Sequence, residues 1–293
     1  MPFVVGKPSL GFYNDLRPHL LAHIDEPGHS QGRLRLLTAD RTTANPVTIA
    51  QIGLGAWQAA AADDAWLPAV EFVARWLSTE LERGEGIPYL FPLTHTYTLS
   101  APWLSAMAQG EAASLLVRAA ATFEKPAWLE LAGEAIRPLL DGLEPLVATT
   151  DEGPVLQEYP TAPPAHVLNG WIFALWGLYD VARSPAGNLD AESAFAAGVA
   201  ALAGRIGLYD IANGWSRYDL FPHPVPNVAS PFYHRLHIEQ LAALNRLAPS
   251  DALAEAEARW RAGLERRSAF ATALAAKVAF RVLRPRRLRR RVS

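Results

Sequence analysis

Residues 102–140 read PWLSAMAQGEAASLLVRAAATFEKPAWLELAGEAIRPLL, and this stretch decides the fold class. It holds two runs of apolar residues at helical spacing, separated by a short connection. Ser100 and Pro102 supply an N-cap residue and an early proline, so we expect the first helix from Pro102 to Phe123. The second helix is expected from Pro126 onward. The stretch therefore predicts a helical hairpin.

The same hairpin pattern recurs on both sides of this stretch. The other predicted pairs cover 46–62 with 63–83, 164–183 with 190–206, and 232–247 with 250–267. Connections within a pair are short. Connections between pairs are long and rich in Gly, Pro, Tyr and His, at 83–101, 143–163 and 207–231. Long ordered loops at one set of junctions usually carry function. We therefore predict an all-α fold, an α/α toroid of four helical hairpins with a cleft on the loop side. An open helical array is the alternative.

The chain is predicted to have three parts. They are an N-terminal arm at 1–44, the toroid at 45–267 and a basic amphipathic tail at 268–293. His19 and His23 lie four residues apart in the arm, but a zinc enzyme needs three protein ligands, and no convincing third one lies nearby. We therefore predict no metal site. The chain has no cysteine, which excludes disulfides and a thiol nucleophile.

The charge of the chain is strongly asymmetric. The formal net charge is −2, yet residues 277–293 contain eight basic residues and no acidic one, which leaves −10 for residues 1–276. A nucleic-acid-binding fold normally carries basic charge on its folded surface, so nucleic acid is a disfavoured partner. A long groove for a polyanion should also be basic. The acidic body therefore favours a short or weakly charged substrate.

The tail predicts a membrane contact. Residues 268–284 are mostly apolar with basic residues on one helix face, and a dense arginine cluster follows. This pattern is typical of an interfacial helix with a polybasic anchor for an anionic membrane surface. The alternative is a last toroid helix with a solvated end. The N-terminus lacks a signal-peptide pattern, and no uninterrupted apolar run reaches the roughly 18 to 20 residues of a membrane span. We expect a cytoplasmic protein, peripheral at the inner membrane face.

Several short motifs occur in an order and spacing that resemble one family. They are WLSAMAQG at 103–110 with Arg118, EYPT at 158–161, VLNG at 167–170, GLYD at 177–180, YDL at 218–220 and YHRLHIEQL at 233–241. This series resembles the C-terminal helical domain of the D-glucuronyl C5-epimerases, which act on heparosan-type glycosaminoglycan chains. The resemblance covers roughly residues 45 to 247 and implies an α/α toroid. It leaves a homodimer as an open alternative.

The reaction that this resemblance implies converts D-glucuronate to L-iduronate residues in a uronate-containing polysaccharide or oligosaccharide. A base must remove the C5 proton, an acid must return one to the opposite face, and the carboxylate must be neutralised. No cofactor is required. Tyrosine can fill both proton-transfer roles when a cation or hydrogen bond lowers its pKa. By resemblance, Tyr159, Tyr218 and Tyr233 handle the protons, and Glu158 tunes or shares the transfer.

The remaining predicted site residues bind substrate. They are Trp103, Gln109, Arg118, Asn169, Arg217, His234 and His237. One departure bears on them: the family has an arginine after Tyr-Asp-Leu, where this chain has Phe221. Arg217, Arg118 or Arg235 would then have to neutralise the carboxylate. The alternatives to an epimerase are a uronate polysaccharide lyase and a non-catalytic carbohydrate-binding or membrane-associated protein.

Overall fold

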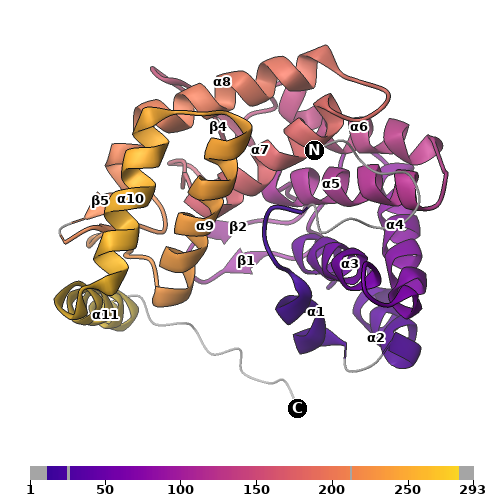
Figure 1. The fold of residues 1–293 in the computed structure, drawn as a ribbon, viewed down its shortest axis with the longest axis horizontal. Helices are drawn as coiled ribbons and strands as arrows, with labels where there is room; N and C mark the ends of the chain where they lie inside the picture. Colours follow the sequence, from indigo (N-terminus) through magenta and orange to yellow (C-terminus); the bar gives the residue numbers. More distant parts are fainter. Residues whose placement is uncertain (1–11, 25–26, 212, 284–293) are drawn as a thin grey trace.

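The computed structural model describes residues 12–24, 27–211 and 213–283, which form helices and three small antiparallel strand pairs (Figure 1). The helices are α1 (Arg17–His23), α2 (Pro27–Ala39), α3 (Pro46–Ala60), α4 (Leu67–Leu81), α5 (Ala106–Thr122), α6 (Ala127–Leu140), α7 (Leu168–Ala182), α8 (Leu189–Arg205), α9 (Pro231–Leu247), α10 (Asp251–Glu265) and α11 (Arg267–Leu283). The predicted mostly-α class is confirmed.

The helices pack as pairs in two layers. Helices α3, α5, α7 and α9 contact one another in that order, and each contacts its own partner among α4, α6, α8 and α10. The partners also contact one another in sequence order and form the second layer. The arm adds to the same pattern, because α1 packs on α3 and α2 packs on α4. Closure of these layers into a toroid stays a prediction.

The packing of α5 against α7 depends on two glycines. A Cβ added at Gly177 would lie 2.3 Å from the Cα of Gly110, closer than real Cβ contacts allow. The two backbones can therefore meet only because both residues lack a side chain. Helix α7 is buried along almost its whole length, so it forms the centre of the hydrophobic core. This close contact fixes the positions of α5 and α7 relative to each other, and the loops of the candidate site extend from these helices.

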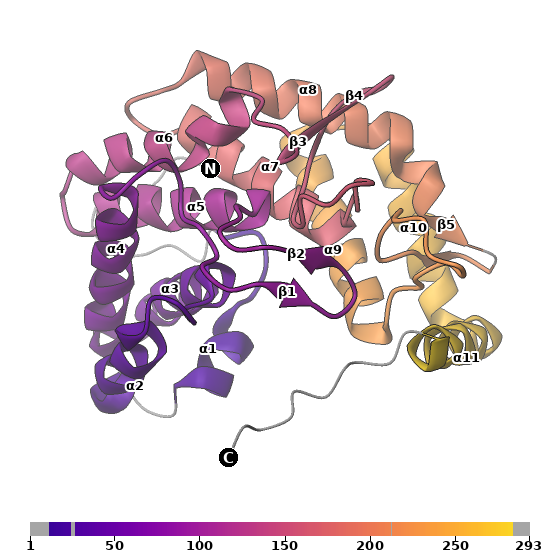
Figure 2. The same ribbon diagram turned by 180° about the vertical axis from the view of Figure 1, so that it is seen from behind.

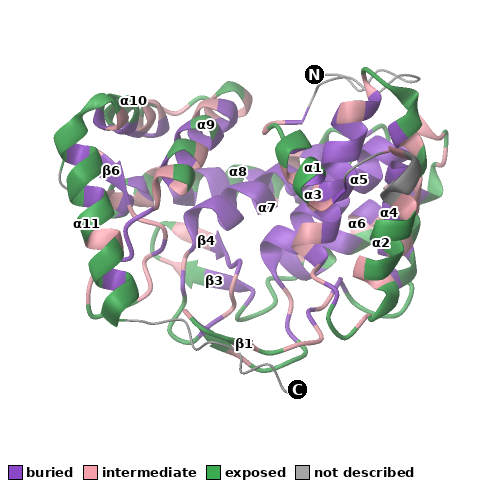
Figure 3. Ribbon diagram, turned by 90° about the horizontal axis from the view of Figure 1, so that it is seen from below, coloured by how far each residue is buried: buried purple, intermediate pink, exposed green. Residues whose placement is uncertain are grey.

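The long connections contain the strand pairs. They are β1 (Leu93–Thr94) with β2 (Thr98–Leu99), β3 (Val147–Thr150) with β4 (Gly153–Leu156), and β5 (Asp210–Ile211) with β6 (Trp215–Ser216). Figure 2 shows β1 and β2 crossing in front of the helices when the protein is seen from behind. Figure 3 shows β1 and β3 on the same edge of the helical layers. Two of the three long connections therefore lie on the same side of the helices.

Helix α5 begins later than predicted. Its first residue is Ala106 rather than Pro102, and the side chain of Ser105 caps it by accepting a hydrogen bond from the Ala108 amide. The preceding backbone pairs with another segment instead: the amide of Trp103 donates to the carbonyl of Tyr89, and the amide of Tyr89 donates to that of Trp103. This pairing holds residue 103 in a loop conformation.

Helix α11 packs against the body of the protein. Ala269, Ala273 and Phe280 are buried on one face of it, and it contacts α10. The predicted boundary between residues 267 and 268 falls in its first turn. The arginine cluster from residue 284 onward lies outside the described residues.

A different helix resembles a membrane span in composition. Within the described part of the chain, the helical stretch Leu189–Tyr209 has the length and a mean hydropathy of 1.2 that a span needs. Core helices of soluble proteins can have the same length and hydropathy. Helix α8, which makes up most of the stretch, packs on α7. The stretch is therefore weak evidence for a span.

Candidate active site

Four tyrosines from the long connections and the start of α9 meet at one place. The ring centroids of Tyr97 and Tyr159 lie 4.8 Å apart, and those of Tyr218 and Tyr233 lie 4.7 Å apart. The two pairs adjoin, because the Tyr218 hydroxyl interacts electrostatically with those of the other three tyrosines. Tyr97 is buried and the others are half-buried. The structure thus brings together the three predicted tyrosines and adds Tyr97.

Glu158 lies buried beside these tyrosines. The Tyr159 hydroxyl donates a hydrogen bond to its carboxylate, and Nδ2 of Asn169 donates to Oε2 at 3.4 Å. Gly170 makes room for the carboxylate, because a Cβ there would lie 2.5 Å from both Cβ and Oε2 of Glu158. Burial raises the pKa of Glu158 to about 7, against an ordinary value of 4.5. Near neutral pH this group can therefore both accept and release a proton.

The tyrosine pKa values differ from the expectation. Burial and the negative charge of Glu158 raise the pKa of Tyr159 and of Tyr218 well above 10. The expected lowering by a cation or hydrogen bond is wrong for this structure: burial is the largest influence on both groups, and the hydrogen bond of Tyr159 to Glu158 also raises the pKa of Tyr159. Both residues are phenols at neutral pH, so each needs a partner that takes its proton before it can act as a base.

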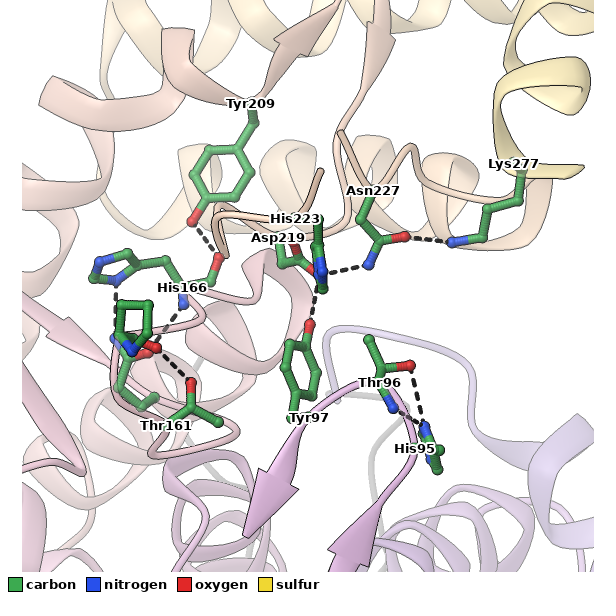
Figure 4. A network of polar contacts seen from close by, with 12 residues as sticks. His95, Thr96, Tyr97, Thr161, His166, Tyr209, Asp219, His223, Asn227 and Lys277 are labelled. Carbon is green, nitrogen blue, oxygen red and sulfur yellow. Dashed lines mark hydrogen bonds and ion pairs between the residues drawn. The ribbon is translucent and has the colours of Figure 1, made fainter. Parts of the chain in front are cut away.

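A second polar network approaches the tyrosines from the C-terminal side (Figure 4). The hydroxyl of Tyr97 and Nδ2 of Asn227 each donate to Oδ2 of Asp219 at 2.5 Å. Nζ of Lys277 in turn donates to Oδ1 of Asn227 at 2.7 Å and lies 5.7 Å from the ring centroid of Tyr218. Sequence reasoning missed both Tyr97 and Lys277.

The two predicted histidines are packing residues. Both are fully buried, and Nδ1 of His234 and Nδ1 of His237 each lie 2.9 Å from Oγ of Ser216. His234 also stacks on Trp215 at 3.9 Å and approaches the carbonyl of Trp260 through Nε2. This placement argues against direct substrate contact. The histidines instead hold β6, which leads into Tyr218.

Arg118 lies in the core between α5 and α7. Its guanidinium pairs with the carboxylate of Asp180 at 2.5 Å, and both side chains are only 1% exposed. The hydroxyl of Tyr13 donates to the same carboxylate at 2.6 Å. A buried arginine held in this way is part of the helix packing, which argues against the predicted role of Arg118 in substrate binding.

Arg217 is half-buried beside Tyr209. Its amide donates to the Tyr209 carbonyl at 2.8 Å, and its charge acts on the Tyr209 hydroxyl. That hydroxyl donates to the carbonyl of His166 at 2.7 Å. Phe221, which stands where the family resemblance predicts an arginine, packs with its ring 5.6 Å from that of Tyr97.

Two predicted residues shape the loop next to the tyrosines. The side chain of Gln109 is buried, accepts from the amide of Ile87 at 2.9 Å and donates to its carbonyl at 3.1 Å. Gln109 therefore holds the chain ahead of β1, and this placement argues against its predicted role in substrate binding. Trp103 stacks on Tyr89 at 3.9 Å, and its ring lies 6.0 Å from that of Tyr159. Trp103 thus belongs to the wall of the site.

A cavity of about 610 Å³ adjoins this wall. Trp103 and Pro160 both line it, so it begins beside the residues that flank Tyr159. Leu99, Pro102 and Leu143 give it a largely apolar lining. Its size and lining are typical of a small-molecule or sugar pocket.

Comparison with known proteins assigns this arrangement to a class. Residues 84–262 match the family described as D-glucuronyl C5-epimerase C-terminus, and the chain belongs to this family. It is 31% identical over 174 residues to the D-glucuronyl C5-epimerase of Caenorhabditis elegans, across 54% of this chain and 28% of that relative. The chain thus matches little more than a quarter of that protein's length. All four tyrosines lie inside the family match, whereas Lys277 lies beyond it.

Proposed function

We propose that the protein is a hexuronate C5-epimerase that converts D-glucuronate to L-iduronate residues in a uronate-containing polysaccharide or oligosaccharide. The observation that supports this most is the group of three half-buried tyrosines around one buried carboxylate, Glu158. The group supplies several proton carriers in one place. Epimerisation needs two of them, one on each face of C5.

The proposed reaction begins with Tyr159 and Glu158 as one base. The ionised Glu158 takes the phenol proton of Tyr159 while the phenolic oxygen removes the proton from C5. The electrons of the C5–H bond pass into the uronate carboxyl group and form an enolate. Tyr233 then donates a proton to the opposite face of C5, which restores the carboxylate. The Tyr233 phenolate and the protonated Glu158 are reset by proton exchange with water. Besides C5–H, only the O–H bonds of the two tyrosines are broken, no carbon–carbon or carbon–oxygen bond is cleaved, and no oxidant is needed.

The cavity beside Trp103 suits the neighbouring sugars of the substrate. Indole rings stack on the apolar faces of pyranose rings, and Trp103 lines the cavity with its ring 6.0 Å from that of Tyr159. We propose that the uronate occupies the tyrosine cluster and that the adjacent residues of the saccharide extend along Trp103 into the cavity. This arrangement fits an oligosaccharide segment better than a single sugar.

The test is exchange of solvent deuterium into C5 of a heparosan-type oligosaccharide, followed by mass spectrometry and NMR. The wild type is expected to incorporate deuterium and to form iduronate. Tyr159→Phe and Tyr233→Phe should each slow the exchange by about 100-fold or more. Tyr179→Phe is the matched control, since this half-buried tyrosine packs on Phe195 instead.

Two results would contradict the proposal. An unsaturated uronate, seen by its absorbance, would identify a lyase that follows the same proton abstraction with elimination. Absence of exchange on heparosan and on a panel of other uronate polymers would identify a non-catalytic binding protein.

We also propose that α11 docks on an anionic membrane surface, at the inner membrane face. Four apolar side chains four residues apart are exposed along this helix: Phe270 at 38%, Leu274 at 46%, Val278 at 54% and Val282 at 72%. The sequence continues with six arginines between residues 284 and 291. Each basic residue near an anionic membrane contributes about 1 kcal/mol.

Cosedimentation with vesicles tests the docking proposal. The full chain should pellet with phosphatidylserine-containing vesicles and not with pure phosphatidylcholine. Leu274→Asp combined with Val278→Asp should abolish the binding. Leu189→Asp, at an 80% exposed position on α8, should leave it unchanged. Equal binding by all three proteins, or binding to neither vesicle, would rule the docking out.

A further inference from the structure

Removal of a proton beside a carboxylate places negative charge on the carboxylate oxygens, which a nearby cation must stabilise. The residue that follows Tyr218, Asp219 and Leu220 is Phe221, whose ring packs against Tyr97 and carries no charge. The charge must therefore come from another part of the chain. This requirement rests on the proposed function.

The three arginines considered from the sequence are poorly placed for this task. Arg118 is buried in its ion pair with Asp180. Arg217 lies beside Tyr209, and Arg235 is exposed on α9 next to the buried His234. Hence the ion pair occupies the Arg118 guanidinium, the Arg217 charge acts on Tyr209, and Arg235 is exposed.

Lys277 reaches the tyrosines from α11. Ala273, one turn before it, and Phe280, one turn after it, are buried and anchor this face of the helix. The Lys277 side chain then extends toward Asn227 (Figure 4). Its ammonium lies 5.7 Å from the ring centroid of Tyr218. A helix outside the family match thus delivers a cation to the proposed catalytic centre.

The ammonium of Lys277 lacks a direct counterion. Its hydrogen-bond partner is the neutral amide of Asn227, and among the described residues no carboxylate forms an ion pair with it. Asp219 is one amide further away, since Asn227 donates to it through Nδ2. Burial lowers the pKa of Lys277 to about 8. An ammonium has three donors, so the bond to Asn227 leaves two available for an anion.

We propose that Lys277 binds the carboxylate of the uronate during epimerisation and stabilises the enolate that forms there. It thereby provides the charge that Phe221 lacks. Asn227 and Asp219 position the ammonium, and the carboxylate of the substrate completes its coordination. The bound uronate would then lie between Lys277 and the hydroxyl groups of the tyrosines.

Binding measurements with a pair of ligands test this assignment. The full chain is titrated calorimetrically with a heparosan-type tetrasaccharide and with its carboxyl methyl ester. The wild type should prefer the acid. Lys277→Met should lose about 10- to 100-fold in affinity for the acid, the range of a charge-assisted hydrogen bond, and should bind the ester as before. Lys277→Arg should recover most of the preference. Arg281→Met removes the same charge one turn away, at an exposed position, and should change neither affinity.

Three results would overturn the assignment. An equal loss of affinity for both ligands in Lys277→Met would mean that Lys277 only holds α11 against the loop that contains Asn227. An unchanged affinity of Lys277→Met for the acid would mean that the ammonium of Lys277 does not contact the carboxylate. Loss of the preference in Arg217→Met, with Lys277→Met unaffected, would assign the carboxylate to Arg217.

Deuterium exchange separates this assignment from the proposed function. Exchange in the wild type that Lys277→Met leaves intact would refute the role of Lys277 in catalysis while the epimerase proposal stands. A Lys277-dependent preference for the acid, without exchange on any uronate, would refute the epimerase proposal and retain the carboxylate site.

Discussion

The hydroxyl of Tyr97 donates a 2.5 Å hydrogen bond to Oδ2 of Asp219, which lies 122 residues further along the chain. This bond ties the β1–β2 connection to the loop after β6, so it holds two walls of the candidate site together. Asp219 also accepts a hydrogen bond from Nδ2 of Asn227. Asn227 in turn accepts one from Nζ of Lys277. The network therefore connects Tyr97, whose ring contacts that of Tyr159, to Lys277, the proposed carboxylate-binding residue.

Tyr97→Phe is expected to lower both stability and C5 exchange. Loss of one buried hydrogen bond to a charged group should reduce the free energy of unfolding by about 1 to 3 kcal/mol, measured by urea denaturation. The exchange rate should fall by about tenfold, because the loss of a 1.4 kcal/mol interaction in the transition state corresponds to that factor. Tyr209→Phe is the control: it removes a partly buried hydrogen bond from the buried Tyr209 to the His166 carbonyl. Equal exchange rates in the two variants would show that the Tyr97 bond has no specific role in the site.

The raised pKa of Glu158 predicts how the free energy of unfolding depends on pH. Its pKa of about 7 in the folded protein lies above the ordinary value of 4.5, so the folded state binds this proton more tightly than the unfolded chain. The resulting stabilisation is fully present below the unfolded value and is lost as pH rises through about 7. The loss is on the order of 3 kcal/mol.

Glu158→Gln should remove this pH dependence. The free energy of unfolding of the wild type should fall more between pH 5 and pH 8 than that of Glu158→Gln, as measured by urea titration at both values. At pH 8 the variant should therefore gain stability relative to the wild type. A parallel pH dependence in both proteins would contradict the raised pKa.

Gly170→Ala is expected to displace the proposed base. The new Cβ would lie 2.5 Å from Glu158, and overpacking of this kind costs about 1 to 3 kcal/mol in the free energy of unfolding. Gly133→Ala provides the opposite control, because nothing lies within 4 Å of the new Cβ on α6. That variant should be stabilised by up to about 1 kcal/mol, measured by urea denaturation. Equal stability of the two variants would show that Gly170 does not make room for Glu158.

The helix pairs could be predicted because the hydrophobic period of each helix is local. The loops with Glu158, Tyr159 and Tyr218 could be predicted because they carry short motifs. Burial could not be predicted for His234 or His237. Their contacts with Ser216 depend on how α9 packs against β6, and no local pattern reports this. The same limit applies to Arg118, whose partner Asp180 lies on a different helix.

Tyr97 and Lys277 were missed for two different reasons. Tyr97 stands in a short connection with threonines on both sides, and the only signal was the richness of that loop in Tyr and His. Lys277 stands in a segment whose basic residues indicated a membrane contact. The small residues Ala269 and Ala273 on the same face of α11 were the available sign that this face packs against the protein.

The charge of Lys277 predicts how ligand binding depends on pH. Three charged or titratable groups act on it or contact it: Asp219, Arg281 and the Tyr218 hydroxyl at the ring it faces. Burial is the largest influence and lowers the pKa of Lys277 to about 8, so the ammonium loses its proton as pH rises from 7 to 9. Affinity for the uronate acid should therefore fall by about tenfold over this range in the wild type, because the protonated fraction of Lys277 falls from about nine-tenths to about one-tenth. Lys277→Arg should keep its affinity, since a guanidinium stays charged. Calorimetric titrations at pH 7 and pH 9 measure both, and an equal decline in the two proteins would assign the pH dependence to a group other than Lys277.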